Sequence, residues 1–175
     1  MAAARRALRR PAARDRGRLT GTAASDGIVV HASCVVVRER GILIRGPSGA
    51  GKSTLARRLI AEGERAGRFA RLVGDDRVVL STSSGRVLAS PVPAAAGLIE
   101  VRGLGICRVA REASCVVRLI VDLVLNGPER LPSLDELHDR LLDVRLPRIR
   151  ADLLTASETV TWPFRVSDDT AVTEL

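Results

Sequence analysis

Eight consecutive residues of this 175-residue chain have the types and the spacing of a phosphate-binding loop. The pattern GxxxxGK[ST] follows an apolar run at residues 42–44 and precedes a segment of helical periodicity, which is the context that the motif requires. Backbone N–H groups of such a loop surround phosphate oxygens, and the helix N-terminus adds its dipole. We predict that Lys52 contacts the β- and γ-phosphates and that the Ser53 hydroxyl ligates Mg²⁺. The predicted nucleotide-binding residues are Gly46, Pro47, Ser48, Gly49, Ala50, Gly51, Lys52, Ser53 and Thr54.

Two adjacent carboxylates, Asp75 and Asp76, end a short apolar run that follows the predicted helix. A carboxylate at this place is a Walker-B-type partner of the metal, directly or through water. Neighbouring side chains at a strand end point to opposite sides, so the two need not share a role. A solvated acidic turn is the alternative interpretation. Taken alone, His31 is more typical of a histidine packed within a strand than of a catalytic residue. Glu100, taken alone, is more typical of a strand residue that faces solvent.

The net charge of +8 lies mostly at the N-terminus. Residues 1–18 hold seven Arg and one Asp, a charge of +6, which leaves +2 for the other 157 residues. A nearly neutral body argues against a nucleic-acid-binding face. Aromatic residues are only 2% of the chain, which argues against a stacking platform for single strands. Of the 28 basic residues only Lys52 is a lysine, which favours a site there that needs a compact ammonium group.

Other features of the sequence indicate a cytoplasmic protein. No apolar run approaches the roughly 18 residues that a membrane helix needs. Three cysteines without a CxxC pattern, Cys34, Cys107 and Cys115, predict buried, reduced thiols. The Arg-rich start, at residues 1–25, predicts a disordered basic tail, although it also resembles a mitochondrial presequence.

The periodicity predicts an α/β fold: a single domain with a strand-rich mixed sheet and few helices. Residues 26–155 form the predicted domain, and residues 156–175 a C-terminal tail of undetermined structure. We expect one strong helix at residues 54–63 and a second, short one at 134–142, which begins at the capping sequence Ser133-Leu134-Asp135-Glu136. The predicted strands cover residues 28–37, 42–44, 69–73 and 116–125, with a hairpin of residues 77–80 and 86–89.

Three segments together resemble the catalytic domain of HPr kinase/phosphorylase, the bacterial regulator that phosphorylates a serine of the phosphocarrier protein HPr. The first is His31 with the phosphate loop that begins 15 positions later. The second, residues 72–78, is similar to the family's L-[VI]-A-D-D-x-V, and the third, residues 99–106, to its E-[IV]-R-G-L-G-I. The resemblance covers about residues 28–110. It implies a P-loop domain related to phosphoenolpyruvate carboxykinase.

The resemblance also implies roles for single residues. Lys52 and Ser53 hold the phosphates of ATP and Mg²⁺, and Glu100 helps to bind the metal beside Asp75. Asp76 is the general base toward the substrate serine and the general acid in the reverse, phosphorylase reaction, and His31 supports it. A serine hydroxyl needs such a proton acceptor while the γ-phosphoryl group transfers in line. The predicted partner is therefore an HPr-like phosphocarrier of the phosphotransferase system.

Three departures from the family pattern point to the short form found in alphaproteobacteria. Thr54 stands at a position where the family usually has an acidic residue. The large N-terminal domain of the long family members has no counterpart in this sequence. The family's C-terminal stretch, which includes a catalytic arginine, has no clear counterpart after Arg150. These departures leave open the phosphorylase activity and a homo-oligomer. Two other functions also stay open: a different P-loop NTPase or small-molecule kinase, and a nucleotide-binding regulatory module without turnover.

Overall fold

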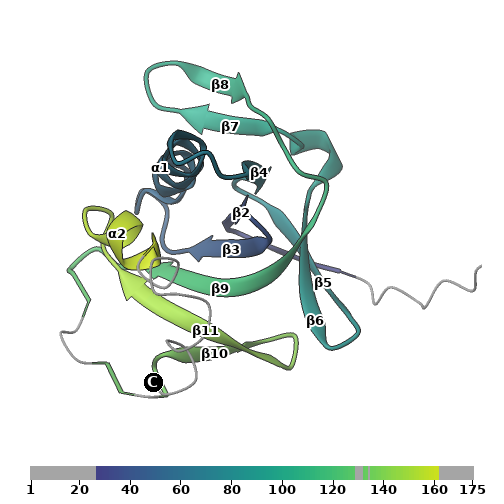
Figure 1. The fold of residues 1–175 in the computed structure, drawn as a ribbon, viewed down its shortest axis with the longest axis vertical. Helices are drawn as coiled ribbons and strands as arrows, with labels where there is room; N and C mark the ends of the chain where they lie inside the picture. The colour runs from purple at the N-terminus through teal and green to yellow at the C-terminus, as the bar shows by residue number, and fades with distance from the viewer. Residues whose placement is uncertain (1–26, 129–131, 134, 162–175) are drawn as a thin grey trace, which may run out of the picture.

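The computed structural model describes residues 27–128, 132–133 and 135–161, and in these residues strands far outnumber helices (Figure 1). In chain order the elements are β1 (Ile28–Val30), β2 (Ser33–Val37), β3 (Arg40–Arg45), α1 (Lys52–Arg65), β4 (Ala70–Gly74), β5 (Val78–Ser83), β6 (Arg86–Pro91), η1 (Pro93–Ala95), β7 (Leu98–Val101), β8 (Gly105–Arg108), β9 (Cys115–Leu123), β10 (His138–Leu141), β11 (Val144–Ala151) and α2 (Ala156–Thr161). The predicted strand-rich α/β class is confirmed.

One mixed sheet organises the molecule, in the order β1-β5-β6-β9-β3-β2-β4. Strand β9 also pairs with β11, which in turn pairs with β10. The pairs β3–β9 and β9–β11 are parallel, so the carboxyl ends of these three strands lie at the same edge of the sheet (Figure 1). Strands β7 and β8 form a separate two-stranded hairpin.

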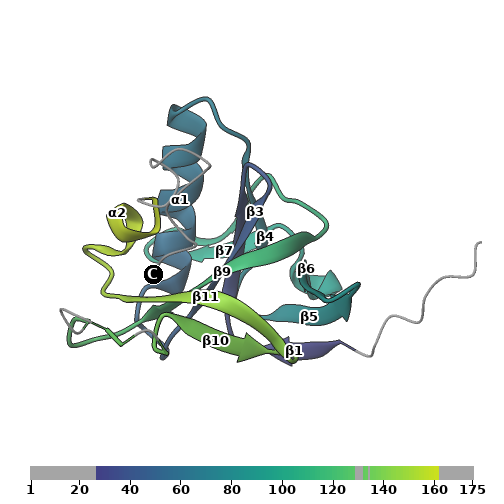
Figure 2. The ribbon, with the colours of Figure 1, turned by 60° about the horizontal axis from the view of Figure 1, so that its bottom comes forward.

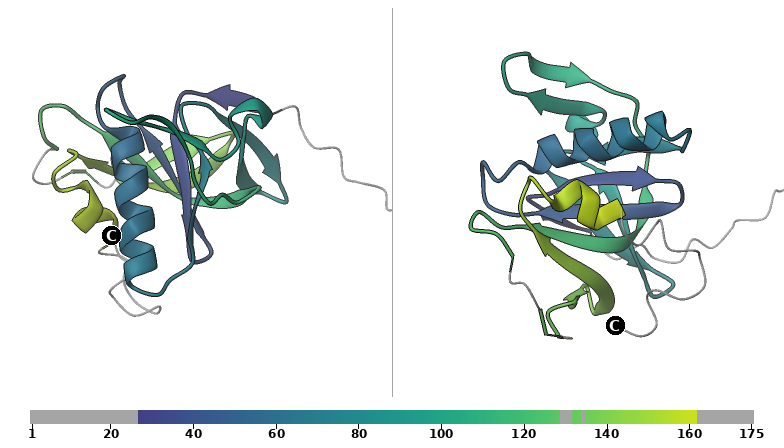
Figure 3. Two further views of the ribbon diagram at one scale, coloured as in Figure 1. Left: turned by 90° about the horizontal axis from the view of Figure 1, so that it is seen from above. Right: turned by 60° about the vertical axis from the view of Figure 1, so that its left-hand side comes forward.

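Helix α1 forms because its apolar residues recur on one face, where Leu55, Ala56 and Leu59 are buried. It lies against the sheet, with α2 beside it (Figures 2 and 3). Ala156 and Val160 of α2 are fully buried in the same core. Residues 156–161 therefore pack with the domain, whereas residues 162–175 lie outside the described part of the chain, as does the predicted basic tail at residues 1–25.

Two hydrophobic cores lie on opposite faces of the sheet, and strand β2 contributes to both. Val35 and Val37 point into the core under α1, whereas Cys34 and Val36 point into the second core, which β5 and β6 help to enclose. This alternation is the two-residue period of a strand buried on both faces. Cys34 and Cys115 are buried in the second core as free thiols, as predicted, but Cys107 is half-exposed.

The prediction of a short helix at residues 134–142 is wrong. One hydrogen bond of the expected capping box does form, from the Ser133 N–H to Glu136 Oε2 at 2.9 Å. The Ser133 hydroxyl donates to the same carboxylate oxygen at 3.0 Å and does not accept from the Glu136 N–H. The chain then continues as strand β10, which turns into β11 through two residues with positive φ, Leu142 and Asp143. Pairing with β11 and an ion pair from Asp139 to Arg45 outweigh the local preference for a helix. Leu134 itself lies outside the described residues.

The other predicted elements are confirmed, with small shifts of their ends. The first helix extends from Lys52 to Arg65, two residues longer at each end than expected. The hairpin of β5 and β6 turns at Ser84 and Gly85, both with positive φ. Residues 28–37 form two strands, because the chain bends at His31 and Ala32 and β1 pairs with β5 whereas β2 pairs with β3 and β4.

Candidate active site

The phosphate-binding loop connects the carboxyl end of β3 to α1, as predicted. Gly49 and Gly51 have positive φ angles of 81° and 94°, a conformation that side chains larger than glycine rarely adopt. In the described part of the chain no side chain caps the α1 N-terminus, and its first turn holds no acidic residue. The first N–H groups of the helix are therefore not taken up by a side-chain cap, and no acidic residue of the helix's own first turn lies beside them. This arrangement fits a phosphate group.

Lys52 is the first residue of α1, and the residue is only 7% exposed. Its ammonium group donates to the carbonyls of Gly46, at 2.9 Å, and Pro47, at 3.1 Å. The side chain thus folds back over the loop that it closes, in the position from which an ammonium group reaches bound phosphates. A planar guanidinium group has a different shape and hydrogen-bonding geometry, so arginine is no substitute at this position.

Asp75 is buried beside the loop and accepts two hydroxyl hydrogen bonds on the same oxygen. Ser53 Oγ donates to Asp75 Oδ1 at 2.9 Å, and Ser33 Oγ donates to it at 2.5 Å. Asp75 is 6% exposed as a residue, and its carboxylate is held against the serine of the phosphate loop. A hydroxyl and a carboxylate oxygen side by side are the ligand types that Mg²⁺ prefers, so the residues present fit this metal.

Asp76 points away from Asp75, toward solvent and His31. A hydrogen bond of 2.7 Å from Arg77 N to Asp75 O spans Asp76, whose φ is +61°. Positive φ at a residue other than glycine costs on the order of 1–3 kcal/mol and persists only where the surroundings impose it. His31 Nδ1 lies 3.1 Å from Asp76 Oδ1 and 3.0 Å from the Asp76 carbonyl oxygen. The turn thus separates a buried carboxylate from an exposed one that a histidine orients.

His31 lies at the bend between β1 and β2, and not within a strand as the sequence indicated. Both members of the pair are exposed: the side chain of His31 by 54% and that of Asp76 by 71%. A group that approaches from solvent therefore has access to the Asp76 carboxylate. An exposed acid can serve a protein-sized substrate, because the substrate need not enter a closed cavity.

Glu100 does not join this cluster in the structure. It lies exposed on β7, while the neighbouring Ile99 is buried in the core under α1. Among the described residues no group of three or more His, Cys, Asp or Glu side chains could hold a metal ion. The role of Glu100 in metal binding stays a prediction.

An ion-pair network that sequence reasoning missed stands directly before the phosphate loop. Arg45, the last residue of β3, donates from Nε to Asp122 Oδ1 at 2.7 Å and from a terminal nitrogen to Asp122 Oδ2 at 2.8 Å. The same terminal nitrogen donates to Asp139 Oδ2 at 2.6 Å. The Asp122 hydrogen bond and charge, with those of Asp139, raise the pKa of Arg45 despite its partial burial. The network joins the last residue of β3 to β9 and β10, and so anchors the strand end from which the loop begins.

Ser33 was also missed, although the sequence holds a signal for it. It is the one hydroxyl residue in β2, a strand in which all five residues are buried. A buried hydroxyl needs a hydrogen-bond partner, and its partner, Asp75, is 42 residues away. The signal for Arg45 is similar: a charged residue ends an apolar strand immediately before the loop.

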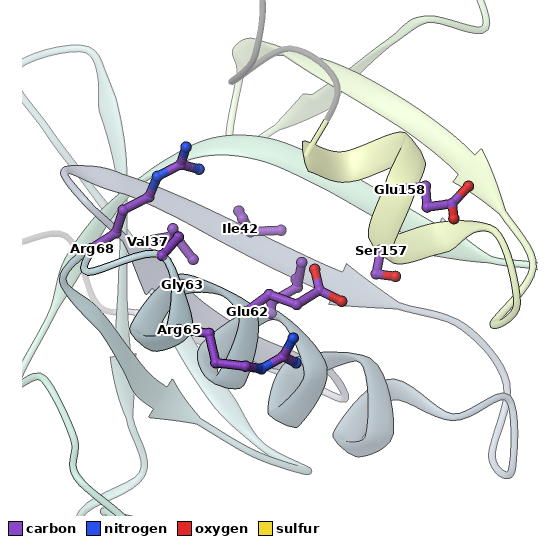
Figure 4. A pocket seen from close by; sticks show the side chains of 10 residues that line it. Val37, Ile42, Glu62, Gly63, Arg65, Arg68, Ser157 and Glu158 are labelled. Carbon is purple, nitrogen blue, oxygen red and sulfur yellow. The ribbon is translucent and has the colours of Figure 1, made fainter.

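A groove of about 500 Å³ lies elsewhere, between the C-terminal half of α1 and helix α2 (Figure 4). Arg65 and Arg68 lie on one side and Glu158 on the other, above a floor that includes Val37 and Ile42. No residue of the phosphate-binding loop lines it. This groove is thus separate from the residues of the candidate active site.

Comparison with known proteins assigns this chain to a protein family. The family model of the HPr serine kinase C-terminal domain matches residues 23–158. The chain belongs to this family. The HPr serine kinase match covers every residue of the phosphate loop, the acidic pair and His31, so the resemblance inferred from the motifs is confirmed.

Individual relatives agree with the family assignment. The HPr kinase/phosphorylase of Geobacillus thermodenitrificans is 35% identical over 131 residues, which are 69% of this chain and 40% of that protein. That of Mycoplasma mycoides subsp. mycoides SC is 31% identical over 114 residues, 61% of this chain and 34% of the relative. This chain thus spans well under half the length of these relatives. The solved Hpr(Ser) kinase/phosphatase from Coxiella burnetii matches with a TM-score of 0.62 and 28% identity, over 76% of this chain and 91% of that one.

Among the described residues no helix is long and apolar enough to cross a membrane.

Proposed function

We propose that this chain transfers the γ-phosphoryl group of ATP, in the presence of Mg²⁺, to a serine hydroxyl of HPr or a related phosphocarrier protein. The observation that carries the proposal is the division of the acidic pair. Asp75 is buried against Ser53 of the phosphate loop, whereas Asp76 is exposed and oriented by His31. Membership of the HPr serine kinase family supports the same assignment.

Each residue has a task that its surroundings support. The loop backbone and Lys52 bind the phosphates, and Ser53 and Asp75 hold the metal, which supplies positive charge at the phosphate oxygens when bound. Asp76 accepts the proton of the attacking serine hydroxyl on a carboxylate oxygen. His31, a positioning residue, fixes the direction of that carboxylate through its 3.1 Å contact. Positioned general bases of this kind typically contribute about 10²–10⁴-fold to the rate.

A protein substrate fits this site better than a small molecule does. The base is 71% exposed, and the phosphate-loop residues Pro47, Ser48 and Gly49 are exposed as well. A small-molecule kinase has to enclose its substrate to exclude water. A protein substrate, in contrast, covers the exposed side of the site with its own surface when it docks.

The test is incubation of the purified chain with ATP, Mg²⁺ and HPr-type phosphocarriers, followed by intact mass and mapping of the modified residue. We expect one added phosphoryl group, on a serine, and its loss with Asp76→Asn. Asp143→Asn is a matched control, because Asp143 is an exposed aspartate with a similar positive φ of 63° in the β10–β11 turn. Nucleotide binding without transfer to any phosphocarrier would support the regulatory-module alternative instead.

A further inference from the structure

Two exposed leucines lie on the loops that follow the strands parallel to the phosphate-loop strand. Leu125 follows β9 and is 69% exposed, and Leu154 follows β11 and is 82% exposed. We propose that this pair forms the surface that receives the purine base of the nucleotide whose phosphates bind at residues 46–53. The inference rests on the proposed nucleotide binding and adds the place of the base.

The three loops converge at one edge of the sheet. Residues Arg45, Asp122 and Arg150 are in register at the ends of β3, β9 and β11. A Cβ placed on Gly46 would lie 2.8 Å from the Leu123 carbonyl oxygen, and Val124 N donates to Ala151 O at 2.9 Å. Ligands of sheets with parallel strands bind outside the carboxyl ends of those strands. This edge is visible in Figure 1, where β3, β9 and β11 point toward α2.

The loop after β11 lies directly against the phosphate loop. A Cβ placed on Gly51 would lie 2.6 Å from a methyl carbon of Leu153, so the Leu153 side chain packs on the loop backbone. Arg58 of α1 donates to the Leu153 carbonyl at 2.8 Å. Leu154 is thus held one residue from a side chain that contacts the phosphate loop.

The same loop is also rigidly built. Asp152 Oδ1 accepts from Leu154 N at 2.9 Å, from Thr155 N at 2.9 Å and from the Thr155 hydroxyl at 3.0 Å. The backbone of Leu154 is therefore fixed while its side chain stays in solvent. An apolar surface that is ordered before binding pays little conformational entropy when a ligand covers it.

The other exposed large apolar side chains of the described residues lie elsewhere. They lie on β1, directly before β4 and in the β7–β8 hairpin, and are Ile28, Val29, Phe69, Leu104 and Ile106. Only Leu125 and Leu154 follow strands parallel to β3. A purine ring is flat and largely apolar on its faces, and nucleotide pockets are lined mostly by apolar side chains with few polar groups. The position of the two leucines beside the phosphate loop and their apolar character both favour a purine base as the group that binds there.

The experiment compares two ligands that differ in the nucleoside. Binding of MgATP and of magnesium tripolyphosphate is measured by calorimetry for the full chain and for Leu125→Ser and Leu154→Ser. The control is Val29→Ser, an exposed apolar residue of β1 that belongs to none of the three loops. We expect each loop variant to lose about three- to tenfold in ATP affinity, because part of a leucine's apolar contact is removed. Affinity for tripolyphosphate should not change, and Val29→Ser should bind both ligands as the wild type does.

A second measurement locates the base without any substitution. Photolabelling with 8-azido-ATP, digestion with trypsin and peptide mass analysis should place the label on residues 119–130 or 151–165, which contain the two leucines. Label confined to other peptides, or unchanged ATP affinity in both leucine variants, would overturn the inference. If the wild type binds neither ATP nor tripolyphosphate, the phosphate site itself is wrong and the proposed function fails with it. If the wild type binds tripolyphosphate as tightly as it binds ATP, only the proposed base surface is overturned.

Discussion

Removing the Ser33 hydroxyl should destabilise the domain through Asp75, far more than an ordinary serine substitution does. Ser33 is fully buried, and its hydroxyl is one of two that donate to Asp75 Oδ1, at 2.5 Å. Hydrogen bonds to charged groups contribute about 1.5–3 kcal/mol. We therefore expect Ser33→Ala to lower the free energy of unfolding by about 2 kcal/mol. For a domain of this size that loss corresponds to a fall in Tm of roughly 4–8 °C.

Urea unfolding followed by circular dichroism measures this loss, and a double-mutant cycle assigns it. In an Asp75→Asn background the Ser33 hydroxyl meets a neutral amide, so Ser33→Ala should cost only about 1 kcal/mol. Ser90→Ala, at a half-buried position on β6, is the matched control and should cost less than about 0.5 kcal/mol. If Ser33→Ala costs no more than Ser90→Ala, the hydroxyl does not hold Asp75 in place and the reasoning is refuted.

Three further predictions concern the loop, the thiols and acid stability. Lys52→Arg should fold normally yet lose most phosphoryl transfer, because a guanidinium group does not fit the cradle; transfer at a near-normal rate would contradict this. The hydrogen bond between the Cys34 and Cys115 thiols, together with burial, raises the pKa of Cys34. Iodoacetamide at pH 8 should therefore modify the half-exposed Cys107 well before Cys34, and equal rates by peptide mass would contradict this. Partial burial alone would raise the pKa of Asp139, but the hydrogen bond and positive charge of Arg45 outweigh it, so the pKa is lowered. Its stabilising effect is therefore present above the unfolded-state pKa and lost as pH falls below about 4. Urea titrations should show a smaller acid loss in Asp139→Asn than in the wild type, and identical pH profiles would count against the ion pair.

The features predictable from sequence are those that neighbouring residues determine. The phosphate loop, helix α1 and the β5–β6 hairpin follow from glycine placement, helical spacing and turn residues within about ten positions of one another. The acidic pair was also placed correctly at a strand end, with its two side chains on opposite sides.

The features that could not be predicted depend on residues distant in sequence. Ser33 and Asp75 are 42 positions apart, and Arg45 and Asp139 are 94 apart. Pairing with β11 and the same long-range ion pair explain why residues 138–141 form a strand, although the Ser133 N–H and Glu136 make a hydrogen bond typical of a helix start. Local preference decides a segment only where no tertiary partner competes.

The most direct test of the central claim, that the two adjacent aspartates do different work, measures MgATP affinity and phosphoryl transfer for Asp75→Asn and Asp76→Asn across Mg²⁺ concentrations. Asp76→Asn keeps the shape and removes the proton acceptor, so it should bind MgATP like the wild type and lose about 10²–10⁴-fold in transfer. Asp75→Asn should instead require more Mg²⁺ for both binding and transfer. Wild-type transfer by Asp76→Asn, or the same defect in both variants, would contradict the division of roles.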